Sequence, residues 1–351
     1  MDSKTVITKE TKNKIRVDYE GKLTVKERLI KKFKESHTWI KAAVTVIRFI
    51  LMLGVSYVIL YPFIAKIAGS FMSREDIVDA TVALIPKHFT LEIYRSIIVD
   101  NHYFEAILNT FILSLLAALI QTFVACLIGY GLAKFKFKGN KAVMVAVVLT
   151  MIIPHSALKL PIMQHFTNFD ILAVQSWNMK GPIELIFGEA LHLDDTYWPY
   201  VVLSITGLAF KNGLYIYLMR QFFNGVPDEL EESAYVDGCG TFRTFLQIII
   251  PLSVPMMITI FLFSFSWQWT DEFYKGMFFM TSTPDDITLW LMPDIVYSIP
   301  SSLNTEYAGK TLYENVINNT SGMMGIAPLI ILYLFGQRYL VQGIERSGIV
   351  G

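Results

Sequence analysis

The chain is poor in charge for its length. Of its 351 residues, 17% are Asp, Glu, Lys or Arg, whereas 53% are hydrophobic. A soluble protein carries about 25% charged residues, so the composition argues against a soluble protein. The positive and negative charges balance to a formal net charge of zero. The chain therefore lacks the basic field that is typical of proteins that bind nucleic acid.

Cysteine is nearly absent. Cys126 lies in an apolar run and Cys239 in a distant polar stretch, so the two residues form neither a metal-ligand spacing nor a disulfide framework. Familiar catalytic motifs are missing as well, because the sequence contains no His-Glu-x-x-His and no Gly-x-Ser-x-Gly. We therefore predict that the chain has no catalytic residues, no metal site and no cofactor of its own.

Long apolar runs are what the sequence has in place of charge. A helix needs roughly 20 mostly apolar residues to cross the hydrocarbon of a bilayer, and helices satisfy their own backbone groups there. The alternating pattern of a membrane barrel is absent. The stretches that qualify are 47–68, 106–132, 142–162, 198–222, 254–273 and 323–341. The sequence predicts an all-α integral membrane protein with six transmembrane helices.

Lysine and arginine predict the orientation of these spans, because cytoplasmic loops carry an excess of both. Basic residues are concentrated in the first 41 residues. The link between the second and third spans is also basic, at Lys134, Lys136, Lys138 and Lys141. Few basic residues lie in the segments 69–105, 163–197 and 274–321. We predict a multi-pass protein of the cell membrane with both termini and the link 223–253 in the cytoplasm.

The two ends of the predicted bundle differ in character. Residues 1–42 are expected to form a cytoplasmic basic tail, and residues 43–351 the membrane domain. The first apolar run starts too far from residue 1 to belong to a cleavable signal peptide. From Leu23 to Ile40 apolar and basic residues are mixed, which fits a helix on the inner membrane surface and a disordered tail equally well. The segments 163–197 and 274–321 are long for turns and are expected to form an external cap.

The link 223–253 has the residues of two short helices. Pro227 suits a first helical position, and Gly238 tolerates the left-handed conformation that ends many helices. Thr241 can cap a second helix, which is expected to stop before Pro251. A short helix on the cytoplasmic face suits docking into a groove of another protein. Packing of that helix on its own bundle explains the same residues, so the residue pattern alone leaves both readings open.

The same link resembles the EAA loop of permeases from ABC importers. That family pattern is Glu-Ala-Ala, three residues, Gly, nine residues, Ile, any residue, Leu, Pro. This chain has Glu-Ser-Ala at 232–234, Gly238, and Ile-Ile-Ile-Pro at 248–251. It departs from the pattern at Ser233 and Ile250, and both departures are modest in size. The loop also falls on the side that the basic residues predict to be cytoplasmic.

Two further stretches are similar to carbohydrate-uptake permeases. Trp269–Phe273 resembles a Trp-Asn-Asp/Glu-Phe segment in their fifth span, and Gln337–Gly343 resembles the C-terminus of the smaller maltose-type permease. The resemblance covers about residue 45 to the end of the chain, apart from an apparent insertion near 171–193. It implies the type I ABC importer permease fold and a bacterial source.

The resemblance also implies partners. ATP and Mg²⁺ would bind a separate dimer of ATPase subunits, so that this chain is a non-catalytic transport subunit. A second, related permease would complete the pore as a heterodimer, and an extracellular solute-binding protein would deliver an oligosaccharide. Glu232, Ala234 and Gly238 would lie at the docking interface with the ATPase. The coupling-loop residues implied by the match are Pro227, Glu231, Glu232, Ser233, Ala234, Asp237, Gly238 and Pro251.

Polar residues inside the predicted spans are candidates for a translocation path. A basic residue at mid-span costs roughly 2.5–3.5 kcal/mol and usually faces protein or water. Lys211, beside Asn212, lies near the middle of the fourth span, where a cavity, a subunit interface, snorkelling and internal pairing all remain open. Trp267, Gln268 and Trp269 combine aromatic faces with hydrogen-bonding groups, which suits sugar rings. Aromatic residues also line membrane interfaces for physical reasons alone.

Two other functions compete with this interpretation. A secondary transporter would use ion-coupling acids or broken helices within its spans, and acids are nearly absent from the predicted spans. An ABC importer for a solute other than a sugar would keep the coupling loop and change only the path. The EAA-like loop favours an ABC importer over a secondary transporter.

Overall fold

The structure is a computed structural model that describes residues 7–10, 16–19, 36–171, 181–279, 290–304 and 309–346. It divides the chain into two compact units, Met1–Ile67 and Ala68–Gly351. The predicted surface helix from Leu23 to Ile40 lies outside the described residues up to residue 35. Parts of the predicted external cap, residues 172–180, 280–289 and 305–308, lie outside them as well.

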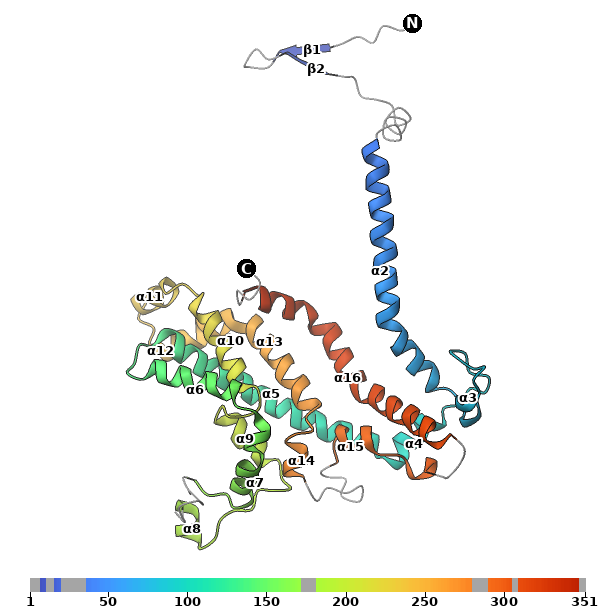
Figure 1. The fold of residues 1–351 in the computed structure, drawn as a ribbon. Coiled ribbons are helices and arrows are strands. Elements are labelled where there is room, and N and C mark those ends of the chain that lie inside the picture. Colours follow the sequence, from blue (N-terminus) through green and yellow to red (C-terminus); the bar gives the residue numbers. More distant parts are fainter. Residues whose placement is uncertain are drawn as a thin grey trace. The chain divides into compact units, whose positions relative to one another are not determined.

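The first unit contains a pair of strands and most of a long helix (Figure 1). The strands β1 (Ile7–Glu10) and β2 (Arg16–Tyr19) pair antiparallel, which the sequence analysis did not predict. The helix α2 (Ser36–Gly69) contains an apolar stretch, Ala43–Gly69, of 27 residues. That length suffices to cross a bilayer and matches the first predicted span. The predicted boundary after residue 42 lies inside α2.

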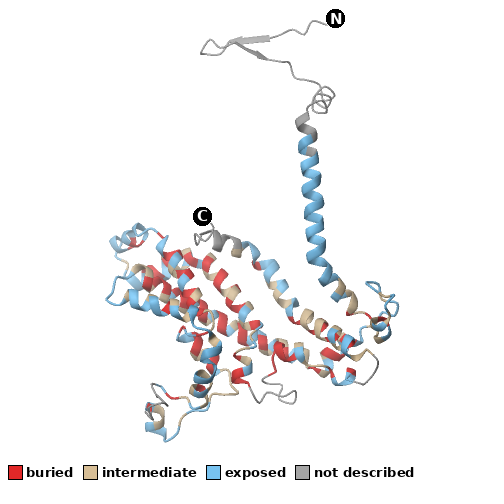
Figure 2. Ribbon diagram, in the orientation of Figure 1, coloured by how far each residue is buried: buried red, intermediate tan, exposed pale blue. Residues whose placement is uncertain are grey.

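The central element of the second unit is α5 (Tyr103–Lys134), which matches the second predicted span (Figure 1). It packs against α9 (Trp198–Ile205), α10 (Asn212–Asn224) and α13 (Ile250–Trp269). On its other side α13 packs against α16 (Lys310–Arg346). Buried residues are accordingly concentrated along α5, α10 and α13 (Figure 2).

The third predicted span, 142–162, is bent. The helix α6 (Asn140–Ile152) ends before Pro154, and the 3₁₀ turn His155–Leu158 leads into α7 (Lys159–Thr167). The two halves lie at 98° to each other. Proline has no N–H to donate and disfavours helical backbone in the residue before it, which explains the break. A single straight helix over 142–162 was therefore a wrong prediction.

The fourth predicted span, 198–222, is broken into α9 and α10. Gly207 and Lys211 have φ values of 74° and 69° in the connection, and left-handed backbone cannot continue a right-handed helix. The prediction of one continuous helix was wrong, because an apolar run does not indicate where the backbone adopts a left-handed conformation. Lys211 occupies the position just before the first residue of α10.

The fifth predicted span is longer than expected. The helix α12 (Thr241–Thr244) runs through a π-helical segment, Phe245–Ile249, directly into α13. The N–H of Ile250 donates to the carbonyl of Phe245 five residues back, and this wider turn makes room for Pro251, which cannot donate. The predicted stop before Pro251 was wrong. Thr241 is the first residue of the helix rather than its cap, since Gly240 holds that position.

Among the described residues, four helices are long and apolar enough to cross a membrane, or five if the bent pair counts as one span. The all-α membrane fold is thus confirmed. The count of six unbroken helices is not met, because the bends at Pro154 and between α9 and α10 divide two of the predicted spans.

Short helices occupy the remaining described segments. In chain order they are α3 (Arg74–Val78), α4 (Glu92–Asp100), α8 (Pro182–Phe187), α11 (Glu229–Val236), α14 (Lys275–Phe278), α15 (Met292–Tyr297) and the 3₁₀ turn Ser301–Leu303. In the apparent insertion, the buried carboxylate of Asp170 accepts hydrogen bonds from the N–H groups of Ile183 and Glu184, both at 2.9 Å. This carboxylate satisfies free donors at the start of α8.

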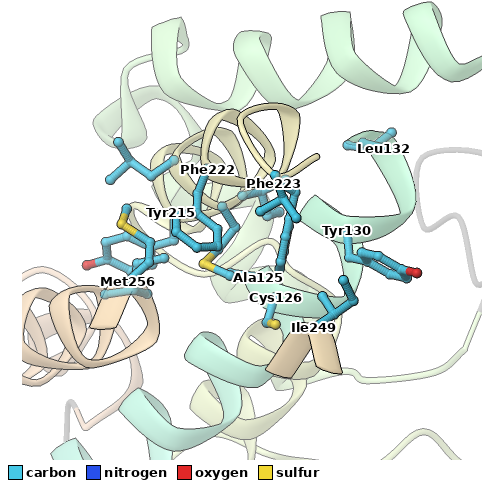
Figure 3. Close-up of a cluster of buried hydrophobic side chains, with 14 of the residues drawn as sticks. Ala125, Cys126, Tyr130, Leu132, Tyr215, Phe222, Phe223, Ile249 and Met256 are labelled. Carbon is cyan, nitrogen blue, oxygen red and sulfur yellow. The ribbon is translucent and has the colours of Figure 1, made fainter. Parts of the chain in front are cut away.

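A buried cluster joins α5, α10 and the π-helical segment at the end of the unit that carries the loop (Figure 3). Its labelled members in the figure include Cys126, Tyr130, Tyr215, Phe223, Ile249 and Met256. The two helices α5 and α10 approach closely at Gly129. A Cβ atom there would lie 2.6 Å from the Cβ of Met219 and 2.9 Å from the backbone nitrogen of Arg220.

We expect Gly129→Ala to destabilise the protein by about 1–3 kcal/mol, because the added methyl group forces α10 away from α5. The matched control is Gly131→Ala in the same helix, where nothing lies within 4 Å of the new Cβ and helix propensity favours alanine. Thermal unfolding of the protein in detergent compares them. Equal midpoints for the two variants would contradict the close packing of α5 against α10.

Candidate coupling loop and intramembrane cavity

The helix α11 lies between α10 and α12, in the link predicted to be cytoplasmic. It begins at Glu229 rather than at Pro227, so Pro227 precedes the helix instead of opening it. Glu229, Glu231 and Glu232 occupy its first turn, where negative charge complements the positive end of the helix dipole. The start of the helix is thus favoured by charge, although no side chain caps it.

Gly238 ends α11 with a Schellman turn. The N–H of Cys239 donates to the carbonyl of Ala234 at 2.9 Å, and the N–H of Gly238 donates to the carbonyl of Tyr235 at 3.0 Å. Gly238 itself has a φ of 82°, the left-handed conformation that this motif needs. The predicted termination at Gly238 is confirmed. A Cβ at Gly238 would meet nothing within 4 Å, so the constraint is the backbone conformation and not the space around it.

Lys134, the last residue of α5, links the loop to the bundle by an ion pair and a hydrogen bond. Its Nζ atom lies 2.5 Å from Oδ1 of Asp228 and 2.6 Å from the carbonyl oxygen of Val226. The lysine side chain is only 8% exposed. The hydrogen bond and the charge of Lys134 hold the pKa of the Asp228 carboxyl below its usual range, so Asp228 stays ionised at neutral pH.

Glu231 provides a second link between α11 and the end of α5. The Tyr130 hydroxyl donates to Oε2 of Glu231 at 3.1 Å, and Nζ of Lys134 lies 3.8 Å from Oε1. The Tyr235 hydroxyl, at 3.5 Å, also points to this carboxylate. Because Glu231 is buried, its charge depends on these partners for compensation. Glu231 therefore faces α5 and is not available on the surface of the loop.

The predicted loop residues divide between two faces of α11. Ala234 is 4% exposed and packs toward the bundle, as Glu231 does. Glu232, Ser233, Asp237 and Gly238 are exposed, and so are Pro227 and Pro251. We call Glu232, Val236, Asp237 and Phe242 the outer face of the loop. It includes two apolar side chains that the sequence analysis missed, Val236 at 87% exposure and Phe242 at 71%.

The broken fourth span brings Lys211 over two aromatic rings. Its Nζ lies 4.6 Å from the ring centroid of Phe210 and 4.6 Å from that of Trp267 on α13. These contacts are cation–π interactions, which stabilise a cation held away from water. Within the described residues Lys211 has no carboxylate partner. Internal pairing, one of the alternatives left open by the sequence, does not occur there.

A small cavity lies beside these rings and holds about 10 Å³, room for about one water molecule. The residues that line it are Gln121, Phe210, Ser264, Trp267, Gln268, Asp271 and Tyr274. Gln121 was missed by the sequence analysis. It donates from Nε2 to Oγ of Ser204 at 3.1 Å and accepts from Oγ of Ser264 at 2.7 Å, so one side chain links α5, α9 and α13.

The structure brings together three of the five predicted path residues. Trp267 and Gln268 line the cavity, and Lys211 lies against Trp267. Trp269 does not line it: its ring is buried, and Nε1 donates to the carbonyl of Gly325 on α16 at 2.8 Å. Asn212 is fully buried and outside the cavity lining, and its amide atoms have no hydrogen-bond partner among the described residues.

A helical membrane bundle with a polar cavity among its spans and a firmly held surface helix is compatible with a transport protein. The family of binding-protein-dependent transport system inner membrane components matches this chain over residues 123–346. The chain belongs to this family. It is therefore a non-catalytic permease subunit of an ABC transport system, as the EAA-like loop predicts.

Curated relatives match nearly the full chain. The polygalacturonan/rhamnogalacturonan transport system permease protein YtcP of Bacillus subtilis (strain 168) is 26% identical over 305 residues, covering 86% of this chain and 96% of that protein. The arabinooligosaccharides transport system permease protein AraQ of the same organism is 25% identical over 310 residues, covering 86% and 94%. A starch degradation products permease, AmyC of Thermoanaerobacterium thermosulfurigenes, is 26% identical over 289 residues, covering 82% and 90%.

Solved structures share the fold. A chain of a bacterial ABC transporter involved in the import of the acidic polysaccharide alginate superposes with a TM-score of 0.60 at 20% identity, covering 85% of this chain and 96% of that chain. A complex of a bacterial alginate transporter with its pentasaccharide-bound periplasmic protein gives 0.56 at 18% identity, covering 88% and 96%. The type I importer permease fold is thus confirmed.

We expect Tyr130→Phe to destabilise the protein by about 1–3 kcal/mol, because Glu231 stays buried and loses a hydrogen-bond donor. The matched control is Tyr235→Phe, which removes the longer contact from a half-exposed side chain and should change little. Thermal unfolding measures stability, and amide hydrogen exchange measures the opening of α11. Unchanged exchange in Tyr130→Phe would contradict the assignment of this hydroxyl as a tie.

Proposed function

We propose that this chain is the membrane-spanning permease of an ATP-driven importer for an oligosaccharide. ATP and Mg²⁺ bind a separate pair of ATPase subunits, and the solute arrives on an extracellular binding protein. A second, related permease completes the pore. Both termini and the loop between α10 and α12 lie in the cytoplasm, as the distribution of lysine and arginine predicts.

The observation that carries this proposal is the outer face of the loop. An exposed helix of eight residues is too short to be stable alone, yet α11 is held at Asp228 and Glu231 and closed by a Schellman turn. Its free face presents Val236 to the surroundings, and Phe242 of the neighbouring α12 is exposed beside the same loop. A rigid helix with an exposed apolar edge suits insertion into a groove of another protein, which on this side is the ATPase.

Two routes carry motion from the loop to the bundle. Lys134 and Tyr130 link α11 to the end of α5. The second route is the continuous helix Thr241–Trp269 of 29 residues, a rod of about 43 Å at 1.5 Å per residue. One end of the rod carries Phe242 at the loop, and the other carries Trp267 at the cavity. Closure of the ATPase pair therefore moves the aromatic wall of the path, in a two-state transition of the bundle.

The substrate is proposed to be acidic. The similar proteins are named for acidic polymers such as polygalacturonan and alginate and also for arabino-oligosaccharides and starch products. Lys211 favours the acidic substrates over the neutral ones. Its cation has no carboxylate partner within the described chain and lies on the faces of Phe210 and Trp267. Aromatic faces receive the apolar faces of sugar rings, and the ammonium group pairs with a uronate carboxylate.

Broken helices do not favour a secondary transporter in this chain. The breaks at Pro154 and Lys211 carry no carboxylate of their own, so neither break contains the acidic side chains of a proton relay. An ABC importer for another acidic solute is the remaining alternative. Transport assays with an acidic oligosaccharide and with acidic solutes that are not sugars distinguish the two.

The proposed function is tested with Gly238→Val in a complex purified from its host and reconstituted in liposomes. Valine is costly in left-handed backbone, by about 1–2 kcal/mol, and disturbs the end of α11, so we expect ATP-driven uptake to fall at least about tenfold. The control is Gly188→Val at the end of α8, with a φ of 86° and equally open surroundings; its uptake should stay near that of the unchanged chain. Uptake that needs no ATP, or equal uptake by both variants, would contradict the proposal.

The substrate proposal is tested with Lys211→Gln in the same liposomes. We expect oligogalacturonate uptake to fall about tenfold or more, because a charge-assisted hydrogen bond contributes about 1.5–3 kcal/mol. Uptake of a neutral oligosaccharide should not fall, and Lys211→Arg should restore most of the uptake of the acidic sugar. An equal loss for acidic and neutral sugars would refute a role in charge selection while leaving the importer function intact.

A further inference from the structure

A basic pocket lies at the link between α5 and α6, at the end of the bundle that carries the loop. It is open, holds about 460 Å³, and is lined in part by Lys136, Lys141 and Arg220. None of the residues that line it is acidic. The contacts of Lys134 and Glu231 with their partners do not include these three cations, and neither does the lining of the intramembrane cavity. The pocket therefore belongs to no site described above.

No carboxylate of the described chain lies within ion-pair distance of the three cations of the pocket, although the charge of Lys136 contributes to lowering the pKa of Asp228. Arg220 projects from α10, and its Nε atom is buried without a hydrogen-bond partner there. None of the three forms an ion pair with the described residues. Their neighbour Lys134 is different, because Asp228 and Glu231 compensate its charge. The Nε atom is out of reach of a ligand in the open pocket, so an anion would be bound by the other guanidinium nitrogens of Arg220, which lines it.

The pocket is formed in advance by the backbone of the link. The Nδ2 atom of Asn140 donates to the carbonyl oxygens of Leu132 at 3.1 Å and Phe135 at 3.0 Å. These two bonds fix the turn between the end of α5 and the start of α6. A preformed arrangement of donors binds a ligand without the entropic cost of ordering the loop.

The rim of the pocket identifies the kind of anion. Phe135 and Phe137 are 43% and 46% exposed and alternate with lysines along the link. Exposed apolar side chains, Val143 and Val145, begin less than one turn beyond Lys141 on α6. The anion site is thus close in sequence to exposed apolar side chains of a predicted span. Basic pockets of this kind at the cytoplasmic side of a bundle suit lipid head groups.

We propose that this pocket binds the phosphate of an anionic phospholipid from the inner leaflet, with its acyl chains along α6. The Arg220 guanidinium donates to two phosphate oxygens as a planar fork. Lys136 and Lys141 supply the remaining charge, and the two phenylalanines lie among the upper acyl carbons. Since Lys134 precedes Lys136 by two residues, the bound lipid holds the end of α5 that anchors the coupling loop.

The site is tested by native mass spectrometry of the full chain, released from detergent after incubation with dioleoylphosphatidylglycerol or with dioleoylphosphatidylcholine. The unchanged chain should retain one phosphatidylglycerol and no phosphatidylcholine. Arg220→Gln and the double variant Lys136→Gln/Lys141→Gln should each weaken this retention about tenfold or more. The control is Lys138→Gln, which removes the same charge from the same link but does not line the pocket, and it should retain the lipid.

Three results would overturn the proposal. One is equal retention of phosphatidylglycerol by the unchanged chain and the pocket variants. Another is displacement of the lipid by millimolar inorganic phosphate, which would make the site a free-phosphate site. The last is cross-linking of Lys136 or Lys141 to an acidic partner subunit in native membranes, with no lipid retained. A thermal melt of each variant in detergent shows that the fold is intact and that the loss belongs to the pocket.

Discussion

The position of the loop, and with it the proposed coupling to an ATPase, depends on the buried ionic contact between the end of α5 and α11. Tyr130 packs its ring 4.9 Å from that of Phe245 and extends its hydroxyl to Glu231, while Lys134 compensates the charge of the loop. A buried carboxylate without partners would cost several kcal/mol, so α11 is stable only in contact with α5. In the proposed mechanism, this dependence makes the loop move together with the bundle.

Two spans of the bundle are interrupted, whereas the helix from Thr241 to Trp269 is continuous. Pro154 and the left-handed backbone at Lys211 interrupt two spans, which places a cation and aromatic rings beside a polar cavity in the bundle. The π-helical turn instead keeps the helix continuous past Pro251, where a regular α-helix would have been disrupted. The proposed translocation path is therefore built from interrupted helices, whereas the proposed transmission is built from an uninterrupted one.

Apolar runs predicted where helices lie, because a bilayer demands long apolar segments whatever the packing. They did not predict the break at Lys211, since a left-handed lysine is imposed by neighbouring helices and leaves no mark on hydropathy. The EAA pattern located the loop and the residue that ends its first helix, Gly238. It did not indicate which face of α11 is exposed. That depends on Tyr130 and Lys134, distant in sequence, which bury Glu231 and Ala234 and leave Glu232 exposed.

The central claim is that the outer face of the loop contacts an ATPase, and a photo-cross-linker at Val236 tests it most directly. Val236 is 87% exposed and makes no tie to the bundle, so a benzoylphenylalanine there should not disturb the fold. After irradiation in native membranes, we expect a single adduct with an ATPase subunit, lost in Gly238→Val. Adducts with lipid or with this chain alone would contradict it and return α11 to a helix that packs only on its own bundle.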